Sequence, residues 1–301
     1  MPVTKLKELI DLARSRSKKR IVVAYGQDVN TLLAVKEAYD LNFAEITLVG
    51  DKETIEKVSQ ENNIDSSCFT IIHEPDEKKS GQKAVQLINE GKGDVLMKGL
   101  ISTDKYLKCI LDKVEGLMIP KATLTHISIT EIPSYHKLIV FADAAFIPAP
   151  DIQQKIAITN YVIDTARKIG VEKPKVALIS FTEKSNPKIQ SCVDAAIISK
   201  MGERGQIKHA CIDGPLALDV AVDPQSVKIK GLKSCVEGDA DCLVFPNLES
   251  ANTFFKTITK LANGEIATYI VGTRVPAILP SRGDSEKSKL YSIAFACLMA
   301  E

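Results

Sequence analysis

Short apolar runs alternate with amphipathic stretches along most of the chain. In the first part of the chain, runs rich in β-branched residues lie at 21–25, 45–49, 69–73 and 94–98. Between them, stretches whose apolar residues recur at helical spacing lie at 29–40, 51–62 and 78–91. Runs of the first kind are typical of buried strands, and the intervening stretches are typical of helices that cover a sheet. The pattern predicts β-α-β-α repetition and a mostly parallel sheet.

The alternation is interrupted once and then resumes. A helix is expected at 103–112, followed by two strands with no helix between them, at 122–130 and 137–142. Further helices are expected at 152–169, 187–201 and 249–262, and further strands at 175–180, 208–212, 241–246 and 267–271. The last apolar run, 275–279, precedes a turn and a final helix whose apolar face carries Leu290, Ile293, Ala294 and Leu298.

The chain is long enough for two domains. Its 301 residues exceed the length at which a single core usually stops growing, about 250–300 residues. The segment Phe146-Ile-Pro-Ala-Pro-Asp151 contains two prolines, which forbid a continuous helix or strand there. We therefore expect the chain to cross between domains at this segment.

Composition and charge exclude several classes of protein. The hydrophobic fraction of 45% and charged fraction of 26% are those of an ordinary globular protein. A net charge of +1 gives no field that would attract nucleic acid or an anionic membrane. No apolar run approaches the roughly 20 residues that span a bilayer, and the N-terminus lacks an apolar signal-peptide core. Seven scattered cysteines without a Cys-x-x-Cys spacing indicate reduced thiols in the cytoplasm, most of them small core residues.

The usual motifs of cofactor, nucleotide and metal sites are missing from the sequence. No Gly-x-Gly-x-x-Gly follows an expected strand, and there is no Gly-x-x-x-x-Gly-Lys-Ser/Thr. The four histidines are isolated, and neither His-Glu-x-x-His nor Gly-x-Ser-x-Gly occurs. What remains is chemistry without a cofactor or a metal.

The turn after the last apolar run carries candidate chemistry. Ser281 and Arg282 follow Pro280, and Asp284 or Ser285 is suited to cap the helix that begins there. A hydroxyl and a guanidinium beside a positive helix N-terminus suit a phosphate-like anion. The alternative is an ordinary cap with a solvated arginine.

A second candidate lies at the end of the expected strand 94–98. Lys98 at a strand end is placed to hold a phosphate as a point charge, because open α/β sheets bind ligands at the carboxyl ends of their strands. Gly99 permits a close backbone approach, and Ser102, Thr103 or Asp104 can cap the next helix. The alternative is an exposed lysine followed by a routine cap.

Polar residues also follow three other expected strands. Asp213 in Asp213-Gly-Pro-Leu216 is placed to orient a ligand, although Asp-Gly-Pro is common turn chemistry. Asn247 follows Pro246 and is also suited to an N-cap, while Lys256 lies four residues beyond Asn252 on the same helical face. Asp143 follows an apolar strand, where burial would raise its pKa. A satisfied buried Asp is the alternative there.

Taken together, these segments resemble the phosphate acetyl/butyryl transferase family over essentially the whole chain. The matching stretches are Val95-Leu-Met-Lys-Gly-Leu100, Asp213-Gly-Pro-Leu216, Val244-Phe-Pro-Asn-Leu248 with Asn252, and Val275-Pro276 with Ser281-Arg282. Four ordered matches are far more specific than any one of them. The compact length and the tail from Ser281 to Ile293 look closer to the butyryl branch than to the acetyl branch.

The resemblance implies a fold and an activity. The fold would be two α/β/α domains with mostly parallel sheets and an interdomain cleft, similar to the isocitrate/isopropylmalate dehydrogenases. Its first domain would comprise 1–145 plus the returning 277–301, and its second domain 146–276. The activity would be acyltransferase chemistry, in which acyl-CoA and phosphate give acyl phosphate and coenzyme A. Coenzyme A would be a substrate, no cofactor would be needed, and the enzyme would be a homo-oligomer.

The resemblance also implies roles for individual residues. In the acetyl branch the Ser-Arg pair contributes to phosphate binding and to stabilising charge during acyl transfer, and these roles carry onto Ser281 and Arg282. Six positions after that arginine the acetyl branch has an Asp that is proposed to take the thiol proton, whereas this chain has Ser288. Asp284 is the nearer acid and the candidate base. The expected substrate-binding residues are Lys98, Gly99, Thr103, Asp213, Asn247 and Asn252.

Three rival functions stay open on the sequence. Phosphate acetyltransferase changes only the acyl chain. A non-catalytic acyl-CoA-binding module, similar to the transferase-like domain of some malic enzymes, keeps the fold without the activity. A dehydrogenase of the isocitrate/isopropylmalate type would need nicotinamide and a set of metal-binding carboxylates.

Overall fold

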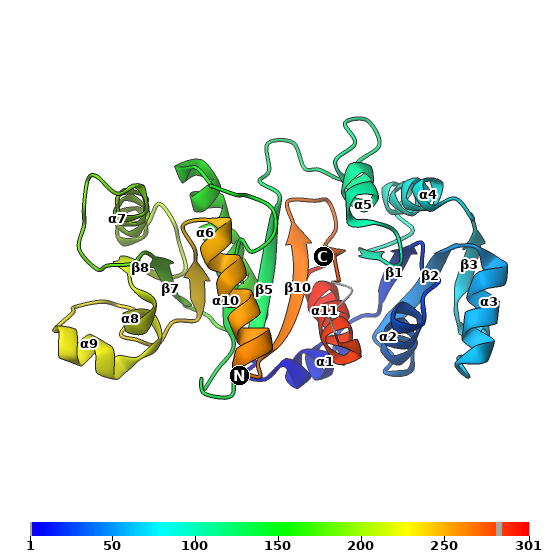
Figure 1. The fold of residues 1–301 in the computed structure, drawn as a ribbon, viewed down its shortest axis with the longest axis horizontal. Coiled ribbons are helices and arrows are strands. Elements are labelled where there is room, and N and C mark those ends of the chain that lie inside the picture. The colour runs from blue at the N-terminus through cyan, green and yellow to red at the C-terminus, as the bar shows by residue number, and fades with distance from the viewer. Residues whose placement is uncertain (1, 281–284, 301) are drawn as a thin grey trace. The chain divides into compact units, whose positions relative to one another are not determined.

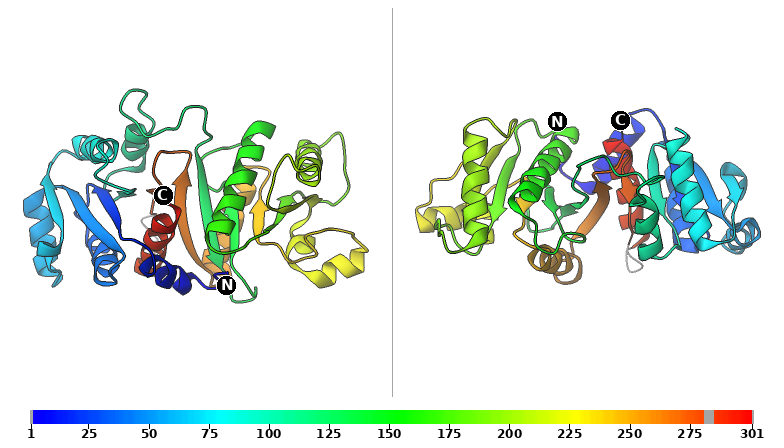
Figure 2. Two further views of the ribbon diagram at one scale, coloured as in Figure 1. Left: turned by 180° about the vertical axis from the view of Figure 1, so that it is seen from behind. Right: turned by 90° about the horizontal axis from the view of Figure 1, so that it is seen from above.

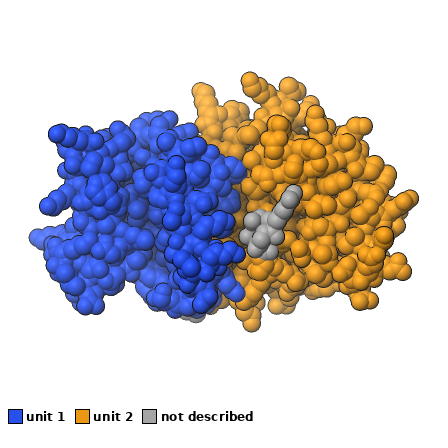
Figure 3. All heavy atoms as spheres, in the orientation of Figure 1, with its two compact units in different colours: residues 1–5, 125–265 blue, residues 6–124, 266–301 orange. Residues whose placement is uncertain are grey.

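The computed structural model describes residues 2–280 and 285–300. The chain divides into two compact units (Figure 3). Unit 1 comprises residues 1–5 and 125–265, and unit 2 comprises residues 6–124 and 266–301. Each unit is built on an α/β pattern, as the periodicity predicts.

Unit 2 contains a mostly parallel part of the sheet in the order β3-β2-β1-β4-β11-β10. Its strands are β1 (Lys19–Ala24), β2 (Ala44–Gly50), β3 (Thr70–His73), β4 (Val95–Lys98), β10 (Glu265–Val271) and β11 (Ala277–Ile278). All neighbouring pairs are parallel except β10 with β11. Parallel pairing with helical crossovers follows from the strand–helix alternation of the sequence.

The helices of unit 2 cover both faces of these strands (Figure 1). They are α1 (Leu6–Arg14), α2 (Val29–Asp40), α3 (Lys52–Glu61), α4 (Glu77–Asn89), α5 (Thr103–Ile110) and α11 (Glu286–Met299), with a short 3-10 turn at Ser66–Cys68. Helix α11 packs against α1 and α2, and α2 packs against α3, whereas α4 and α5 pack against each other. The C-terminal helix thus belongs to the same unit as the first four strands.

Helix α11 is more deeply enclosed than its sequence pattern indicates. Every residue from Lys289 to Met299 is buried, not only the expected face. The reason is that α1 and α2 lie against it, so apolar residues such as Phe295 and Met299 on its other sides are covered too. A helix that is apolar on all sides is typical of the interior of a protein.

Unit 1 contains strands in the order β5-β6-β9-β7-β8. They are β5 (Thr125–Glu131), β6 (Ile139–Ala142), β7 (Lys175–Ile179), β8 (Cys211–Leu216) and β9 (Cys242–Val244). β5 and β6 are antiparallel, and the other pairs are parallel. The helices are α6 (Ile152–Lys168), α7 (Gln190–Glu203), α8 (Leu218–Val222), α9 (Pro224–Lys230) and α10 (Leu248–Leu261). α6 and α10 lie on opposite faces (Figure 2).

The boundary of the units differs from the one expected at residues 145–146. Strand β6 pairs with β9, with Val140 opposite Cys242 and Phe141 opposite Leu243. β5 and β6 therefore both belong to unit 1, which the chain enters near Thr125. The proline-containing segment 146–151 is an internal connection that leads to α6, whose N-cap is Asp151.

The expectation that all seven cysteines are reduced thiols is wrong for one pair. Cys211 and Cys235 form a disulfide, because the first residue of β8 and the segment after α9 come together in space. Four other cysteines (109, 192, 242 and 297) are buried, as expected for small core residues, and Cys68 is partly exposed. Among the described residues no helix is both long and apolar enough to cross a bilayer. A cytoplasmic location stays a prediction.

The disulfide is expected to stabilise unit 1 by restraining the unfolded chain. Cys235→Ser, compared with the wild type under oxidising conditions, should lower the free energy of unfolding by roughly 2–4 kcal/mol. Urea unfolding with and without a dithiol reductant measures the effect. The matched control is Cys68→Ser, which removes a thiol outside the disulfide. Equal stability of the wild type with and without reductant, together with alkylation of all seven thiols after unfolding in the absence of reductant, would contradict the bond.

Candidate active site

Lys98 ends strand β4 in the interior of unit 2. Its side chain is buried with 5% exposure, and its ammonium donates to the carbonyl of Gly99 at 3.3 Å. Strand β4 pairs with β1 on one side and with β11 on the other, which fixes the backbone from which this side chain extends. The buried hydroxyl of Tyr106 on α5 lies 3.3 Å from the Leu96 carbonyl and 3.1 Å from the Ile278 carbonyl. Tyr106 therefore ties α5 to both strands beside Lys98.

Gly99 is required by the chain's own backbone. A Cβ atom at this position would lie 2.5 Å from the Tyr25 carbonyl oxygen and 2.9 Å from the Gly26 Cα. The Gly99 amide donates to the carbonyl of Ala24 at 2.9 Å. The close approach that the sequence suggested is thus made by the turn after β1, which accounts for this glycine without a ligand.

Thr103 is the exposed first residue of α5. The N-cap is Ser102, whose side chain makes no capping hydrogen bond. Its backbone amide instead donates to the Glu77 carboxylate at 2.6 Å, and Glu77 also pairs with Lys105. These bonds lower the pKa of Glu77, with the Lys105 contact as the largest cause. Helix α4 thereby fixes the N-terminal end of α5 near the end of β4.

The segment that leads to the Ser-Arg pair starts beside Lys98. In β11, Ala277 lies opposite Leu96 and Ile278 opposite Met97, so the next residue is level with Lys98. The predicted catalytic residues Ser281, Arg282 and Asp284 lie outside the described residues. Of the two cap candidates, Ser285 caps α11, and its hydroxyl accepts from the Ser288 amide at 3.1 Å.

The predicted site residues of unit 1 have clear structural partners. Asp213 accepts from the Gly214 amide at 2.8 Å and the Ser199 hydroxyl at 3.4 Å. Asn247 caps α10 by accepting from the Ser250 amide at 2.9 Å, which is the alternative reading of this residue. The Asn252 side-chain amide donates to the carbonyl of Ala144 at 3.1 Å.

Asp143 stands at the end of β6 within a ring of backbone amides. Its Oδ1 accepts from His126, Ala145 and Phe146 at 3.3, 2.9 and 3.2 Å, and its Oδ2 accepts from Ile147 at 2.9 Å. Burial raises the pKa of Asp143, and the four amides oppose that rise. A carboxylate with this many N–H partners organises its turn, in the way that buried polar groups normally find partners.

His126 belongs to the same corner of unit 1 and was not among the predicted site residues. It lies in β5 opposite Asp143, with its ring 6.0 Å from that of Phe146. Burial and, as a smaller cause, the positive charge of Lys256 together lower the pKa of His126 to about 4. The sequence shows His126 as isolated, because only the antiparallel register of β5 and β6 brings it to Asp143.

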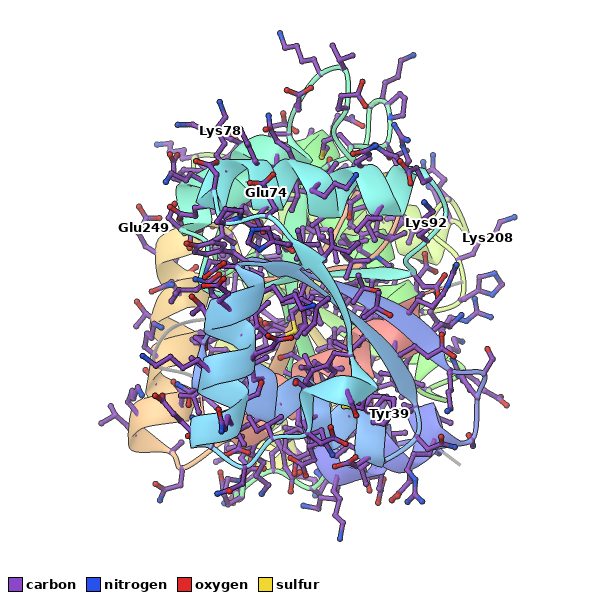
Figure 4. All side chains as sticks on the ribbon, turned by 90° about the vertical axis from the view of Figure 1, so that its right-hand side faces the viewer. Tyr39, Glu74, Lys78, Lys92, Lys208 and Glu249 are labelled. Atoms are coloured by element: carbon purple, nitrogen blue, oxygen red, sulfur yellow. A yellow bond between two sulfur atoms is a disulfide. The ribbon has the colours of Figure 1, made fainter. Side chains whose placement is uncertain are left out.

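A groove of about 1000 Å³ lies within unit 2 between α4 and α5. Glu74 and Lys78, which line this groove, are labelled in Figure 4. Its charges largely neutralise one another, as in the Lys108–Asp104 pair at 2.8 Å. In residues 2–280 and 285–300 no group of three or more His, Cys, Asp or Glu side chains is arranged to hold a metal ion.

The structure therefore gathers the predicted residues into two sets. In unit 2, Lys98 and Thr103 lie near the end of β11, from which the chain continues to Ser281. In unit 1, Asn247 and Asn252 lie at the carboxyl ends of β6 and β9, together with Asp143 and His126. Asp213 lies two strands away from this corner, because β7 separates β8 from β9.

The sequence pattern of one family matches nearly the whole chain. The family described as "Phosphate acetyl/butaryl transferase" matches residues 5–86 and 77–297. The chain belongs to this family. The resemblance read from the four motifs is thereby confirmed.

Individual relatives agree with the family. The chain is 40% identical to a phosphate butyryltransferase of Clostridium acetobutylicum, over 97% of each chain. It is 37% identical to a phosphate acetyltransferase of Thermotoga maritima, over 98% of this chain and 99% of that one. Among solved structures, a branched-chain phosphotransacylase from Enterococcus faecalis is 30% identical, with a TM-score of 0.82 over 94% of this chain and 100% of the other.

The buried His126 predicts a pH dependence of stability. The pKa of His126 is about 4 in the folded protein, and the ordinary value is 6.5. The unfolded chain binds the proton first, so stability is full above pH 6.5 and falls as the pH drops toward 4. Between pH 7.5 and pH 5, the free energy of unfolding of the wild type should fall by about 2 kcal/mol more than that of His126→Gln. Urea unfolding of both proteins at both pH values measures this, and equal losses would show that His126 is not the cause.

Proposed function

We propose that the protein is a phosphate acyltransferase of the butyryl type. It converts butyryl-CoA, or another short-chain acyl-CoA, and phosphate into acyl phosphate and coenzyme A, reversibly. The observation that carries this function is the 40% identity to the Clostridium acetobutylicum phosphate butyryltransferase over 97% of both chains. The buried Lys98 at a strand end, beside the strand that leads to Ser281 and Arg282, supports it.

We propose that the two compact units act as two domains with the active site in a cleft between them. The division follows the units at residues 6–124 with 266–301 and 125–265, because β5 and β6 pair within unit 1. Coenzyme A acts as a substrate, and the reaction needs no cofactor or metal. We also propose a homo-oligomer in the cytoplasm, as the family resemblance implies.

The proposed reaction is direct transfer between the two bound substrates. A phosphate oxygen attacks the thioester carbonyl carbon, the carbon–sulfur bond breaks, and the proton released by phosphate ends on the sulfur of coenzyme A. Holding both substrates in one complex replaces a bimolecular encounter and supplies much of the rate. Asp284 is the proposed carrier of the proton.

The other residues position the substrates. Arg282 donates hydrogen bonds to the phosphate oxygens. Ser281 donates a hydrogen bond to the carbonyl or bridging oxygen, on which negative charge develops in the transition state. Lys98 and Thr103 attract phosphate or the phosphates of coenzyme A. Asn252 lines the site from unit 1, while Asn247 contributes by fixing the start of α10. Asp213 stays a proposed substrate contact, and the contribution of Gly99 is to let the turn after β1 approach β4.

A thiol-release assay tests the function itself. Purified protein with butyryl-CoA should release free thiol only when phosphate is present, and hydroxylamine should trap the acyl phosphate. Acetyl-, propionyl- and valeryl-CoA in the same assay give the chain-length preference through kcat/KM, where one methylene in a pocket is worth about 1–3 kcal/mol. Binding of butyryl-CoA without any turnover would instead indicate a non-catalytic module. Reduction of NAD with a hydroxy acid and Mg²⁺ would indicate a dehydrogenase.

Variants of Ser281 and Arg282 distinguish the binding of phosphate from the stabilisation of charge in the transition state. Ser281→Ala should mainly lower kcat, by about 10²–10³-fold, as expected for the loss of one hydrogen-bond donor to the transition state. Arg282→Ala should both lower kcat and raise the phosphate KM, because a bidentate guanidinium contact is lost in the substrate complex and in the transition state. Steady-state kinetics with varied phosphate measure both. An unchanged phosphate KM in Arg282→Ala would refute phosphate binding by this residue. A covalent acyl-Ser281 intermediate in a quenched reaction would refute direct transfer.

A further inference from the structure

A short turn follows β6 in unit 1 and is hydrogen-bonded to the start of α10. This turn, residues 143–148, is here named the Asp143 turn. The Asp143 carboxylate accepts four backbone N–H groups, three of them from the turn itself. Asp143 is 3% exposed, so these bonds are shielded from water. The turn is therefore held in one shape by a single side chain.

Helix α10 is bonded to the Asp143 turn at two points. The Leu248 amide donates to the Pro148 carbonyl at 3.0 Å, and the Asn252 side chain donates to the Ala144 carbonyl at 3.1 Å. One contact lies at the first residue of the helix and the other one turn further along. Together they fix both the start and the rotation of α10 relative to the carboxyl end of β6.

Lys256 extends from α10 one turn beyond Asn252, on the same face. It is exposed, and its ammonium lies 4.6 Å from the centre of the Phe255 ring. Within the described part of the chain no carboxylate pairs with it, which is also true of other exposed lysines of unit 1 such as Lys188 and Lys260. Its positive charge lowers the pKa of the buried imidazole of His126. The face thus carries a positive charge that unit 1 itself leaves uncompensated.

We propose that Asn252 and Lys256 form a phosphate-binding face for the substrates, with Lys256 contacting the anion and Asp143 acting as the positioning residue that holds this face in place. The inference rests on the proposed function and adds residues to it. The bound group is a phosphate, which comes either from inorganic phosphate or from coenzyme A.

The chemistry of both side chains suits such a group. A phosphate oxygen accepts a charge-assisted hydrogen bond from the Lys256 ammonium, which is stronger than a bond between neutral groups. The Asn252 amide nitrogen carries two hydrogens, and the bond to Ala144 uses one of them. The second hydrogen is available for another oxygen of the same anion. Asp143 touches no substrate, because its oxygens are committed to backbone amides.

Three variants of α10 test the face. Lys256→Met keeps the aliphatic stem and removes the charge, Lys256→Arg restores the charge, and Lys260→Met removes an exposed charge one turn further along the same helix. Lys256→Met should raise the KM of the contacted substrate about tenfold, in line with the loss of one charged contact. Lys256→Arg should recover most of that loss, and Lys260→Met should behave like the wild type.

Separate measurements identify the source of the phosphate. If inorganic phosphate is the ligand, its KM rises in Lys256→Met and its binding weakens in calorimetry. If coenzyme A is the ligand, the butyryl-CoA KM rises and inhibition by adenosine 3′,5′-diphosphate weakens. Unchanged values for both substrates in Lys256→Met overturn the face. The binding measurements need no turnover, so a wild type that binds these probes but releases no thiol would refute the function without refuting the face.

A titration of His126 by NMR tests the same site by a measurement that does not depend on enzyme activity. Binding of a phosphate at Lys256 should raise the pKa of His126, because the anion offsets the positive charge that lowers it. Lys256→Met should raise the same pKa without ligand and should abolish the ligand's effect. A His126 pKa that is identical with and without saturating inorganic phosphate and adenosine 3′,5′-diphosphate places the anion elsewhere.

The positioning role of Asp143 is tested by coupling to Lys256. Asp143→Asn keeps one acceptor oxygen and should raise the same KM as Lys256→Met, with a smaller change in kcat. If Asp143 acts through α10, the double variant should be little worse than Lys256→Met alone. Independent, multiplying effects would overturn the positioning role. Circular dichroism and the KM of the other substrate in the Asp143→Asn variant show whether the fold is retained.

Discussion

Parallel hydrogen bonding between neighbouring strands brings their carboxyl ends to one edge, and the described candidate residues depend on that alignment. In unit 2 the ladder from β1 through β4 to β11 sets Lys98 level with the chain that continues to Ser281. In unit 1 the ladder from β6 through β9 brings the Asp143 turn to the start of α10. Residues far apart in sequence therefore become neighbours through backbone bonds, before any side chain contributes.

The buried polar groups of unit 1 are stabilised in different ways. Asp143 keeps its place through four backbone amides, and His126 does so by remaining neutral. Lys155 and Asp194 form a buried ion pair at 2.6 Å between α6 and α7. Breaking such a pair by removing one partner leaves a buried charge, which usually costs about 3–5 kcal/mol. The interior of unit 1 thus fixes its polar groups closely, which keeps the nearby turns in defined positions.

The sequence predicted most elements because their burial leaves a periodic pattern. The expected helix at 29–40 is α2 (Val29–Asp40), and the helix expected at 249–262 is α10, shifted by one residue. Helix α9 was missed because none of its residues is buried, although Asp223, Pro224 and Gly231 are good start and stop signals. The Cys211–Cys235 bond, the pairing of His126 with Asp143 and the neighbours of Gly99 depend on tertiary contacts that no local pattern carries.

The burial of α11 among α1 and α2 has a consequence for synthesis on the ribosome. Residues 6–124 emerge early, but their core stays open until the last helix leaves the exit tunnel. Residues 125–265 emerge in between and can complete their own strand pairing first. The earlier-made half of the protein would therefore finish folding last, and its uncovered apolar surface would need protection from aggregation during that delay.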